Sequence, residues 1–144
     1  MRSITIVLLI AVAGCAAPPQ QTIRYASDQR GLPDATALDI YEACFRHYFA
    51  SARHPSPAPC YLYVEGARPP DALLARLSAA GYVVRAGGSR IPDTARWYSL
   101  QLGTTTRDRS YVLASDNRHD HMRTFHVVNR SGRWTVTRNE IVTI

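Results

Sequence analysis

The second half of the chain alternates between apolar and polar residues in short segments, and this pattern limits the fold more than any other feature. Such alternation is typical of strands that bury one face. Four such segments follow one another with no helical stretch between them, over residues 95–102, 110–114, 122–128 and 133–144. Because consecutive strands joined by short turns pair antiparallel, we expect an antiparallel sheet here, with its clearest hairpin at 129–132.

Two helices and two short strands are predicted before this sheet. Residues 35–51 and 72–80 carry apolar side chains at helical spacing. Residues 60–64 and 82–85 are short segments rich in aromatic and β-branched side chains. The order α-β-α-β-β-β-β-β predicts an α+β domain, with a curved antiparallel sheet of about four to six strands and two helices packed on one face.

The last predicted strand contains a conflict in its alternation. Strict alternation places Trp134, Val136 and Val142 on the same face as Arg138 and Glu140. A charged residue on an apolar face must find a partner or leave that face. Either the two charged side chains pair with each other, or a bulge shifts the register near them.

The amino terminus has the pattern of an export signal. Arg2 precedes an uninterrupted apolar run at 4–13, which Gly14 and Cys15 follow. This run is too short to span a membrane as a helix, which needs about 20 residues, whereas a charge, a short apolar core and small residues are typical of a cleaved signal. The segment Val12-Ala13-Gly14-Cys15 resembles the lipobox of bacterial lipoproteins.

This resemblance implies a lipid anchor on Cys15, formed after cleavage before that residue. Residues 1–14 would be the signal peptide, 15–33 the lipidated cysteine and a flexible tether, and 34–144 one globular domain. Residue 16 is Ala rather than Asp, which in lipoproteins of Gram-negative bacteria implies the outer membrane, here at its periplasmic face. An ordinary secretory signal with an incidental cysteine is the alternative.

Two further cysteines are predicted to form a disulfide. Cys44 and Cys60 are an even pair in a chain that is expected to be exported, and disulfides persist outside the cytoplasm. Closing a loop of about 15 residues is worth roughly 3 kcal/mol in the chain-entropy description. The Cys-x-x-Cys spacing of a redox pair is absent, and too few thiols lie nearby for a zinc site.

The chain is basic, with a net charge of +6, and all 17 of its cationic side chains are arginine. Arginine offers a planar set of donors that suits phosphate and carboxylate. Apart from Arg2, these residues are spread from Arg24 to Arg138 without a cluster or a helical stripe. Because nucleic-acid binding needs a concentrated basic patch, we expect no nucleic-acid partner.

The segment 115–121 contains the densest group of chemically useful side chains. His119 and His121 would lie on one side of an extended chain, with His126 further along, and two imidazoles with a carboxylate could bind zinc or copper. The run Asp116-Asn117-Arg118 is also typical of a hairpin tip, which is the interpretation that we favour. We therefore predict neither a metal nor another cofactor.

The final hairpin resembles that of NTF2-like and cystatin-like domains. Gly132-Arg133-Trp134-Thr135-Val136 corresponds to their Gly-x-Trp-x-Val strand, which follows a hairpin turn. The resemblance implies a curved sheet that embraces a helix and forms a pocket, used by some members for catalysis and by many for binding. The inward Asp/His pair of the enzymatic members cannot be matched in this sequence.

No constellation in the sequence identifies a reaction. The serines lack a Gly-x-Ser-x-Gly elbow, and the glutamates show no spacing that suits acid–base work. We expect a non-catalytic, lipid-anchored envelope protein that binds another envelope protein or a small apolar or anionic ligand. The alternative is a small lipid-anchored enzyme, which would need a buried carboxylate or histidine with a shifted pKa beside a tyrosine or arginine.

Overall fold

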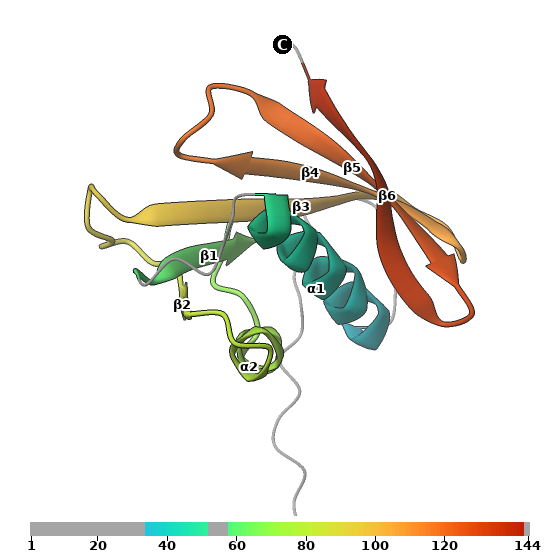
Figure 1. Ribbon diagram of the computed structural model, residues 1–144, viewed down its shortest axis with the longest axis horizontal. Coiled ribbons are helices and arrows are strands. Elements are labelled where there is room, and N and C mark those ends of the chain that lie inside the picture. Colours follow the sequence, from blue (N-terminus) through green and yellow to red (C-terminus); the bar gives the residue numbers. More distant parts are fainter. Residues whose placement is uncertain (1–33, 52–57, 143–144) are drawn as a thin grey trace, which may run out of the picture.

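The computed structural model describes residues 34–51 and 58–142, which fold into two helices and one six-stranded sheet. The helices are α1 (Asp34–Ser51) and α2 (Asp71–Ala79). The strands are β1 (Cys60–Val64), β2 (Val84–Ala86), β3 (Arg96–Thr105), β4 (Arg109–Asp116), β5 (Met122–Arg130) and β6 (Arg133–Val142). The predicted α+β class and the predicted order of elements are confirmed (Figure 1).

The sheet is mixed, which corrects the prediction of an antiparallel sheet. Its strand order is β2-β1-β3-β4-β5-β6. β3 to β6 form the expected antiparallel meander, but β1 lies parallel to both of its neighbours, β2 and β3. The parallel pairing of β1 with β2 follows from α2, which connects these two strands. A helix between two neighbouring strands returns the chain to its starting end, so the second strand runs in the same direction as the first.

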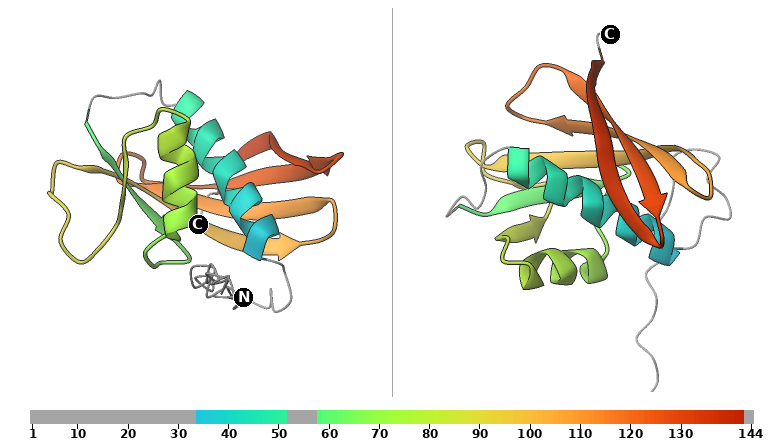
Figure 2. Two further views of the ribbon diagram at one scale, coloured as in Figure 1. Left: turned by 90° about the horizontal axis from the view of Figure 1, so that it is seen from below. Right: turned by 45° about the vertical axis from the view of Figure 1, so that its right-hand side comes forward.

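The core lies between α1 and the sheet. Figure 2 shows α1 crossing one face of the sheet, and its contacts reach β5 and β6. Strand β4 buries every second residue, as a strand with one covered face should. α2 contacts α1 and β2, and it buries Leu73 and Leu77. The largest fully buried side chains of α1 and the sheet are Tyr41, Phe45, Phe49, Phe125, Ile40, Leu62, Leu100 and Leu102.

A bulge resolves the conflict in the last strand. The register between β5 and β6 shifts between His126 and Val127. Val136 therefore lies opposite the buried Val127, whereas Arg138 lies opposite His126 on the other face. Arg138 and Glu140 also form an ion pair there. Both of the alternatives that the sequence left open are thus realised.

The two cysteines of the described domain are not joined by a disulfide, so the predicted Cys44–Cys60 bond is not formed in the structure. Both side chains are buried in the core, and burial raises the pKa of the Cys44 thiol far above its usual range. Loop length and cellular compartment do not determine whether two thiols come within bonding distance. The predicted signal peptide, Cys15 and the tether lie outside the described residues.

The described part of the chain contains no helix that is both long and apolar enough to span a membrane.

Candidate functional site

A buried carboxylate lies where the end of α1 meets the end of β4. Asp116 is only 6% exposed, and it is the one charged residue in the buried class within the described part of the chain. The Tyr48 hydroxyl donates to Asp116 Oδ2 over 2.6 Å. Because a buried charge is costly unless it is hydrogen-bonded, this contact ties the helix to the sheet at a defined point.

The same carboxylate organises the turn between β4 and β5. Asp116 Oδ1 accepts the backbone N–H groups of Arg118 and His119, over 2.7 and 3.0 Å. The Nδ1 atom of His119 lies 2.8 Å from Asp116 Oδ2. An aspartate that begins a turn commonly bonds to backbone groups two or three residues further on. The hairpin tip lies where the sequence predicts it. The side chain of Asp116, the first residue of this tip, is buried and accepts several hydrogen bonds.

These contacts keep Asp116 ionised. Burial alone would raise the pKa of this carboxyl, but the hydrogen bonds from Tyr48, His119 and the Arg118 backbone together lower it below its ordinary value. For Tyr48, burial and then the hydrogen bond to Asp116 raise the pKa of the phenol well above its usual range. The proton therefore stays on the tyrosine and the negative charge on the aspartate.

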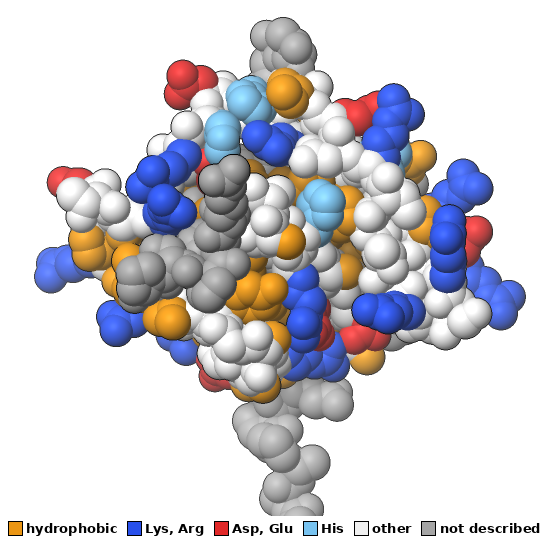
Figure 3. Space-filling model, in the orientation of Figure 1, with side chains coloured by type: hydrophobic (Ala, Val, Ile, Leu, Met, Phe, Trp, Pro, Cys, Tyr) orange, Lys and Arg blue, Asp and Glu red, His pale blue; other side chains and the backbone are white. Residues whose placement is uncertain are grey.

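Asp116 forms part of a cavity of about 250 Å³ that is rich in arginine. Three arginines line it, Arg96 in β3, Arg118 in the β4–β5 turn and Arg123 in β5. Tyr48, Ser51, Tyr98 and His119 complete the lining. We call this cavity the arginine pocket. Three arginines against one carboxylate leave it positively charged, and Figure 3 shows arginine and histidine side chains gathered over the β4–β5 turn.

The sheet register explains why Arg123 lies near Asp116. Asp116 lies opposite Tyr98 on β3, and Ala114, two residues earlier on β4, lies opposite Arg123 on β5. Residues two apart on a strand share a face, so Asp116 and Arg123 are diagonal neighbours there.

Arg123 has an unused donor. Its Nε atom is buried and has no hydrogen-bond partner among the described residues. A buried N–H group without a partner costs roughly 1–3 kcal/mol, more when it is charged. Arg123 thus has one donor without an acceptor among the described residues, in a side chain that also lines the cavity.

The three histidines considered as metal ligands are not brought together. The His119 and His121 rings lie 5.3 Å apart, but His126 is occupied elsewhere, because its Nε2 lies 2.8 Å from Glu140 Oε2 and its ring packs against Tyr111. Within residues 34–51 and 58–142, no three His, Cys, Asp or Glu side chains form a group that could hold a metal ion.

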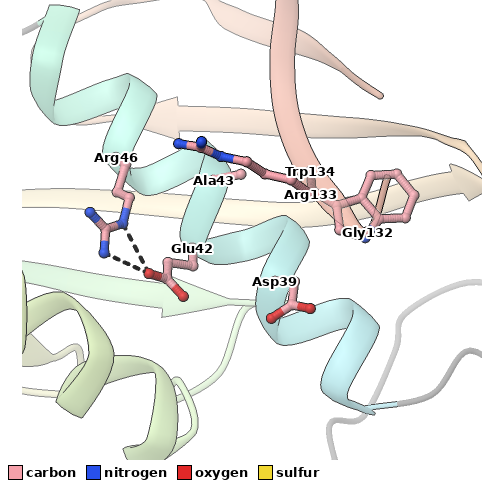
Figure 4. Close-up of a pocket in the computed structure, with 7 residues that line it drawn as sticks. All are labelled: Asp39, Glu42, Ala43, Arg46, Gly132, Arg133 and Trp134. Atoms are coloured by element: carbon pink, nitrogen blue, oxygen red, sulfur yellow. Dashed lines mark hydrogen bonds and ion pairs between the residues drawn. The ribbon is translucent and has the colours of Figure 1, made fainter. Parts of the chain in front are cut away.

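A second hollow, of about 410 Å³, lies between α1 and the β5–β6 hairpin (Figure 4). Its acidic residues are already paired. Glu42 binds Arg46 at 2.7 Å, and Arg76 of α2 reaches both Asp39 at 2.7 Å and Glu42 at 3.3 Å. Its carboxylates are therefore satisfied by neighbouring arginines, whereas the arginine pocket has an excess of positive charge and an unpartnered donor. We favour the arginine pocket as the functional site.

Comparison with known proteins gives no match to a family model, to a curated protein or to a solved structure.

Sequence reasoning found part of this site and missed the rest. Asp116, Arg118 and His119 stand together in the chain and were recognised as a cluster. Tyr48 lies within the predicted helix 35–51, but its buried hydroxyl requires a partner that only the fold supplies. Asp116 and His119 also lie in direct contact in the structure, which their order in the chain did not predict.

Proposed function

We propose that this chain is a lipid-anchored cell-envelope protein whose folded domain binds a small anionic ligand in the arginine pocket without transforming it. The observation that carries the proposal is the arrangement of Arg96, Arg118 and Arg123 around the buried Asp116. Guanidinium groups donate in pairs to carboxylate and phosphate oxygens, and these charge-assisted hydrogen bonds are about twice as strong as neutral ones. Asp116 accepts the backbone N–H of Arg118 and so holds the turn from which the Arg118 side chain extends.

The expected ligand is therefore a carboxylate or a phosphate of modest size. A cavity of about 250 Å³ is slightly below the usual range for drug-sized ligands, about 300–1,000 Å³. The pocket adjoins the end of α1, which supplies Tyr48 and Ser51 to its lining. We propose that both helices pack on one face of the sheet, as in an NTF2-like domain.

Anion binding can be tested by NMR titration of the full chain with inorganic phosphate and with succinate. Arg123→Gln should weaken binding about tenfold or more, because a hydrogen bond to a charged group is worth roughly 1.5–3 kcal/mol. Arg85→Gln is the matched control, since Arg85 is an exposed arginine of β2 outside the pocket. If both variants bind phosphate and succinate as the unaltered protein does, the arginine pocket is not the binding site.

The lipid anchor rests on the lipobox resemblance at residues 12–15. One acyl chain alone anchors a protein marginally, so stable attachment needs the two or three chains that lipoprotein maturation adds. Labelling of cells with palmitate should mark the unaltered protein and Cys44→Ser, and Cys15→Ser should lose the label and remain unprocessed. Retention of label in Cys15→Ser would exclude Cys15 as the anchor.

A second candidate function is catalysis by the same pocket, which one contact favours. Asp116 holds Nδ1 of His119, so the Nε2 atom of this half-exposed ring is left to accept a proton. The arginines could stabilise negative charge that develops during a reaction. Ser51 also lines the pocket, but its hydroxyl donates to the Tyr48 carbonyl over 2.8 Å. We therefore rank catalysis second.

Binding and catalysis can be separated with His119→Ala. Under the catalytic alternative, this variant should lose turnover of carboxylic or phosphoric esters while it still binds phosphate. Under the binding proposal, neither the unaltered protein nor the variant turns over such esters.

A further inference from the structure

We propose that the domain docks on an anionic lipid bilayer through four arginines at one end of its sheet. This inference rests on the proposed lipid anchor and adds the surface that faces the membrane. Arg107 lies in the β3–β4 turn and Arg109 begins β4, while Arg130 ends β5 and Arg133 begins β6. All four residues are exposed, and together we call them the basic end.

The strand register brings three of these arginines together on one face of the sheet. Arg109 lies opposite Val128 across β4 and β5. Arg130 follows Val128 by two residues on β5, so it shares the face of Val128 and is a diagonal neighbour of Arg109. Arg133 lies directly opposite Arg130 across the two-residue turn of the β5–β6 hairpin.

The β3–β4 turn is held beside this hairpin and adds the fourth arginine. The Asn129 backbone N–H donates to the Asp108 carbonyl over 2.8 Å. Arg107 precedes Asp108 in the chain, so it stands next to this contact. Figure 3 shows arginine side chains gathered at the right-hand end of the molecule, where Figure 1 shows these two turns.

The charge of the basic end is not neutralised within the domain. No acidic residue among the described ones forms an ion pair with any of its four arginines. Asp108 lies among them, but its Oδ1 accepts the Thr106 hydroxyl over 3.2 Å. Like charges directly opposite each other destabilise a strand pair, as Arg130 and Arg133 do here. An anionic partner would relieve this repulsion.

The chain enters the domain at the same end. α1 begins at Asp34, and Figures 1 and 2 show its first turns at the end of the sheet that carries the β3–β4 and β5–β6 turns. Asp39 of α1 and Gly132 of the β5–β6 turn line one hollow, in agreement with this placement. Under the proposed function Cys15 carries the acyl chains, and residues 16–33 reach at most about 60 Å when fully extended.

An anionic bilayer is the partner that the charge and the point of entry favour together. Four arginines against Asp34 and Asp108 leave an excess of two positive charges at this end. Each arginine near an anionic membrane surface is worth about fivefold in affinity. The anchor keeps the bilayer within the length of residues 16–33, which gives it a high effective concentration that a soluble acidic partner lacks.

Docking through the basic end would turn the arginine pocket away from the bilayer. β4 begins at Arg109 in the basic end and ends at Asp116 in the arginine pocket. A strand of 8 residues is about 25 Å long. The arginine pocket would therefore open to the aqueous phase, and its anionic ligand would come from there rather than from the bilayer.

The docking can be tested with the acylated protein in nanodiscs of phosphatidylcholine, alone or in equal mixture with phosphatidylglycerol. A gadolinium-chelating lipid in each disc broadens the NMR signals of amides that approach the bilayer. With phosphatidylglycerol, the amides of 106–109 and 129–133 should broaden strongly, whereas those of 116–121 at the far end of β4 should not. This difference should disappear in phosphatidylcholine alone and shrink at high salt, because exposed charges are screened.

Two double variants with equal loss of charge locate the docking surface. Arg130→Gln combined with Arg133→Gln should lower the ratio of docked to undocked protein by about tenfold or more. Arg85→Gln combined with Arg90→Gln removes the same charge from exposed arginines of β2 and the loop after it, and should leave docking unchanged.

The outcomes separate this inference from the proposed lipid anchor. Acylated protein that enters both kinds of nanodisc without preferential broadening at the basic end would overturn the docking and leave the anchor standing. A chain that lacks acyl groups and elutes apart from the nanodiscs would overturn both. Equal effects of the two double variants would attribute the attraction to net charge and overturn the basic end as the docking surface. Signal shifts at the basic end with polyglutamate, but no broadening with phosphatidylglycerol, would assign this surface to an acidic protein instead.

Discussion

At the scale of single residues, two tyrosines of α1 connect the helix to acidic residues. The Tyr41 hydroxyl donates to Glu65 Oε1 over 2.5 Å, and Tyr48, seven residues further on, donates to Asp116 Oδ2 over 2.6 Å. Seven residues are about two turns, so the two hydroxyls leave the same face of the helix. Each contact is buried or partly buried and fixes the position of the helix along the sheet more narrowly than apolar packing does.

Replacement of Tyr48 by phenylalanine should destabilise the domain by about 1–3 kcal/mol, because it removes a donor from a buried carboxylate and leaves the ring in place. Urea denaturation measures the change in free energy of unfolding. Tyr111→Phe is the control, since Tyr111 is 43% exposed, and it should change stability by less than about 0.5 kcal/mol. Equal effects of the two substitutions would mean that the Tyr48–Asp116 contact does not stabilise the fold.

Asp116 should make stability depend on pH in the acidic range. Its pKa is lower in the folded protein than the roughly 3.9 of an unfolded chain, so the unfolded state takes up its proton first as pH falls. The stabilisation by the ionised carboxylate is therefore fully present above about pH 4 to 5 and is lost as pH falls through the folded pKa. A loss of stability toward low pH is the direction expected for a carboxyl whose pKa is lower in the folded state than in the unfolded state.

The measurement compares the free energy of unfolding of the unaltered protein and Asp116→Asn between pH 7 and pH 3. The unaltered protein should lose stability toward low pH more steeply than Asp116→Asn. The difference between their free energies of unfolding should therefore become smaller as pH falls. The pKa of His47, lowered by burial and by Arg123, affects both proteins and largely cancels in this difference. Parallel pH profiles would show that Asp116 is not the acid-sensitive group.

At the scale of elements, strand pairing was predicted correctly where two strands that pair in the sheet also follow each other along the chain. β1 was predicted at its observed bounds, and the β5–β6 hairpin at its observed turn. The parallel pairing of β1 with β3 could not be predicted, because residues 65–95 separate the two strands and local alternation carries no information about a distant partner. The sequence predicts the bulge beside Val127 only as one of two alternatives, because the alternation of apolar and polar residues does not show whether an extra residue is inserted in the strand.

The loop after β2 depends on one close approach. A Cβ added at Gly87 would come within 2.3 Å of the Tyr63 ring, and the Tyr63 hydroxyl donates to the Gly88 carbonyl over 2.9 Å. Gly87→Ala should therefore destabilise the domain by about 1–3 kcal/mol, because the ring or the strand must shift. Gly88→Ala, where nothing lies within 4 Å of the added Cβ, should have almost no effect in the same thermal unfolding experiment. Similar effects of the two substitutions would rule out the Tyr63 contact as the cause.

At the scale of the whole molecule, the arginine pocket is a product of topology. Its residues come from α1, β3, β4, the β4–β5 turn and β5, and only the sheet order brings them together. Arg96 and Arg123 looked like two members of a scattered set of arginines, because their spacing in the chain says nothing about their spacing across strands. The sequence could therefore predict the turn that contains Asp116 and His119 but not the positive charge around it.

Ligand binding should stabilise the entire domain if the pocket functions as proposed. A ligand that binds only the folded state raises the free energy of unfolding by about 2.7 kcal/mol at a concentration 100 times its dissociation constant. Phosphate also stabilises proteins non-specifically, because it is excluded from their surfaces, and that effect acts on every variant alike. Specific binding therefore appears as the additional stabilisation that phosphate gives the unaltered protein and Arg85→Gln, compared with Arg123→Gln at the same phosphate concentration. Thermal unfolding measures this difference. An increase of equal size in all three proteins would attribute the effect to the solvent and leave the arginine pocket without a measurable ligand.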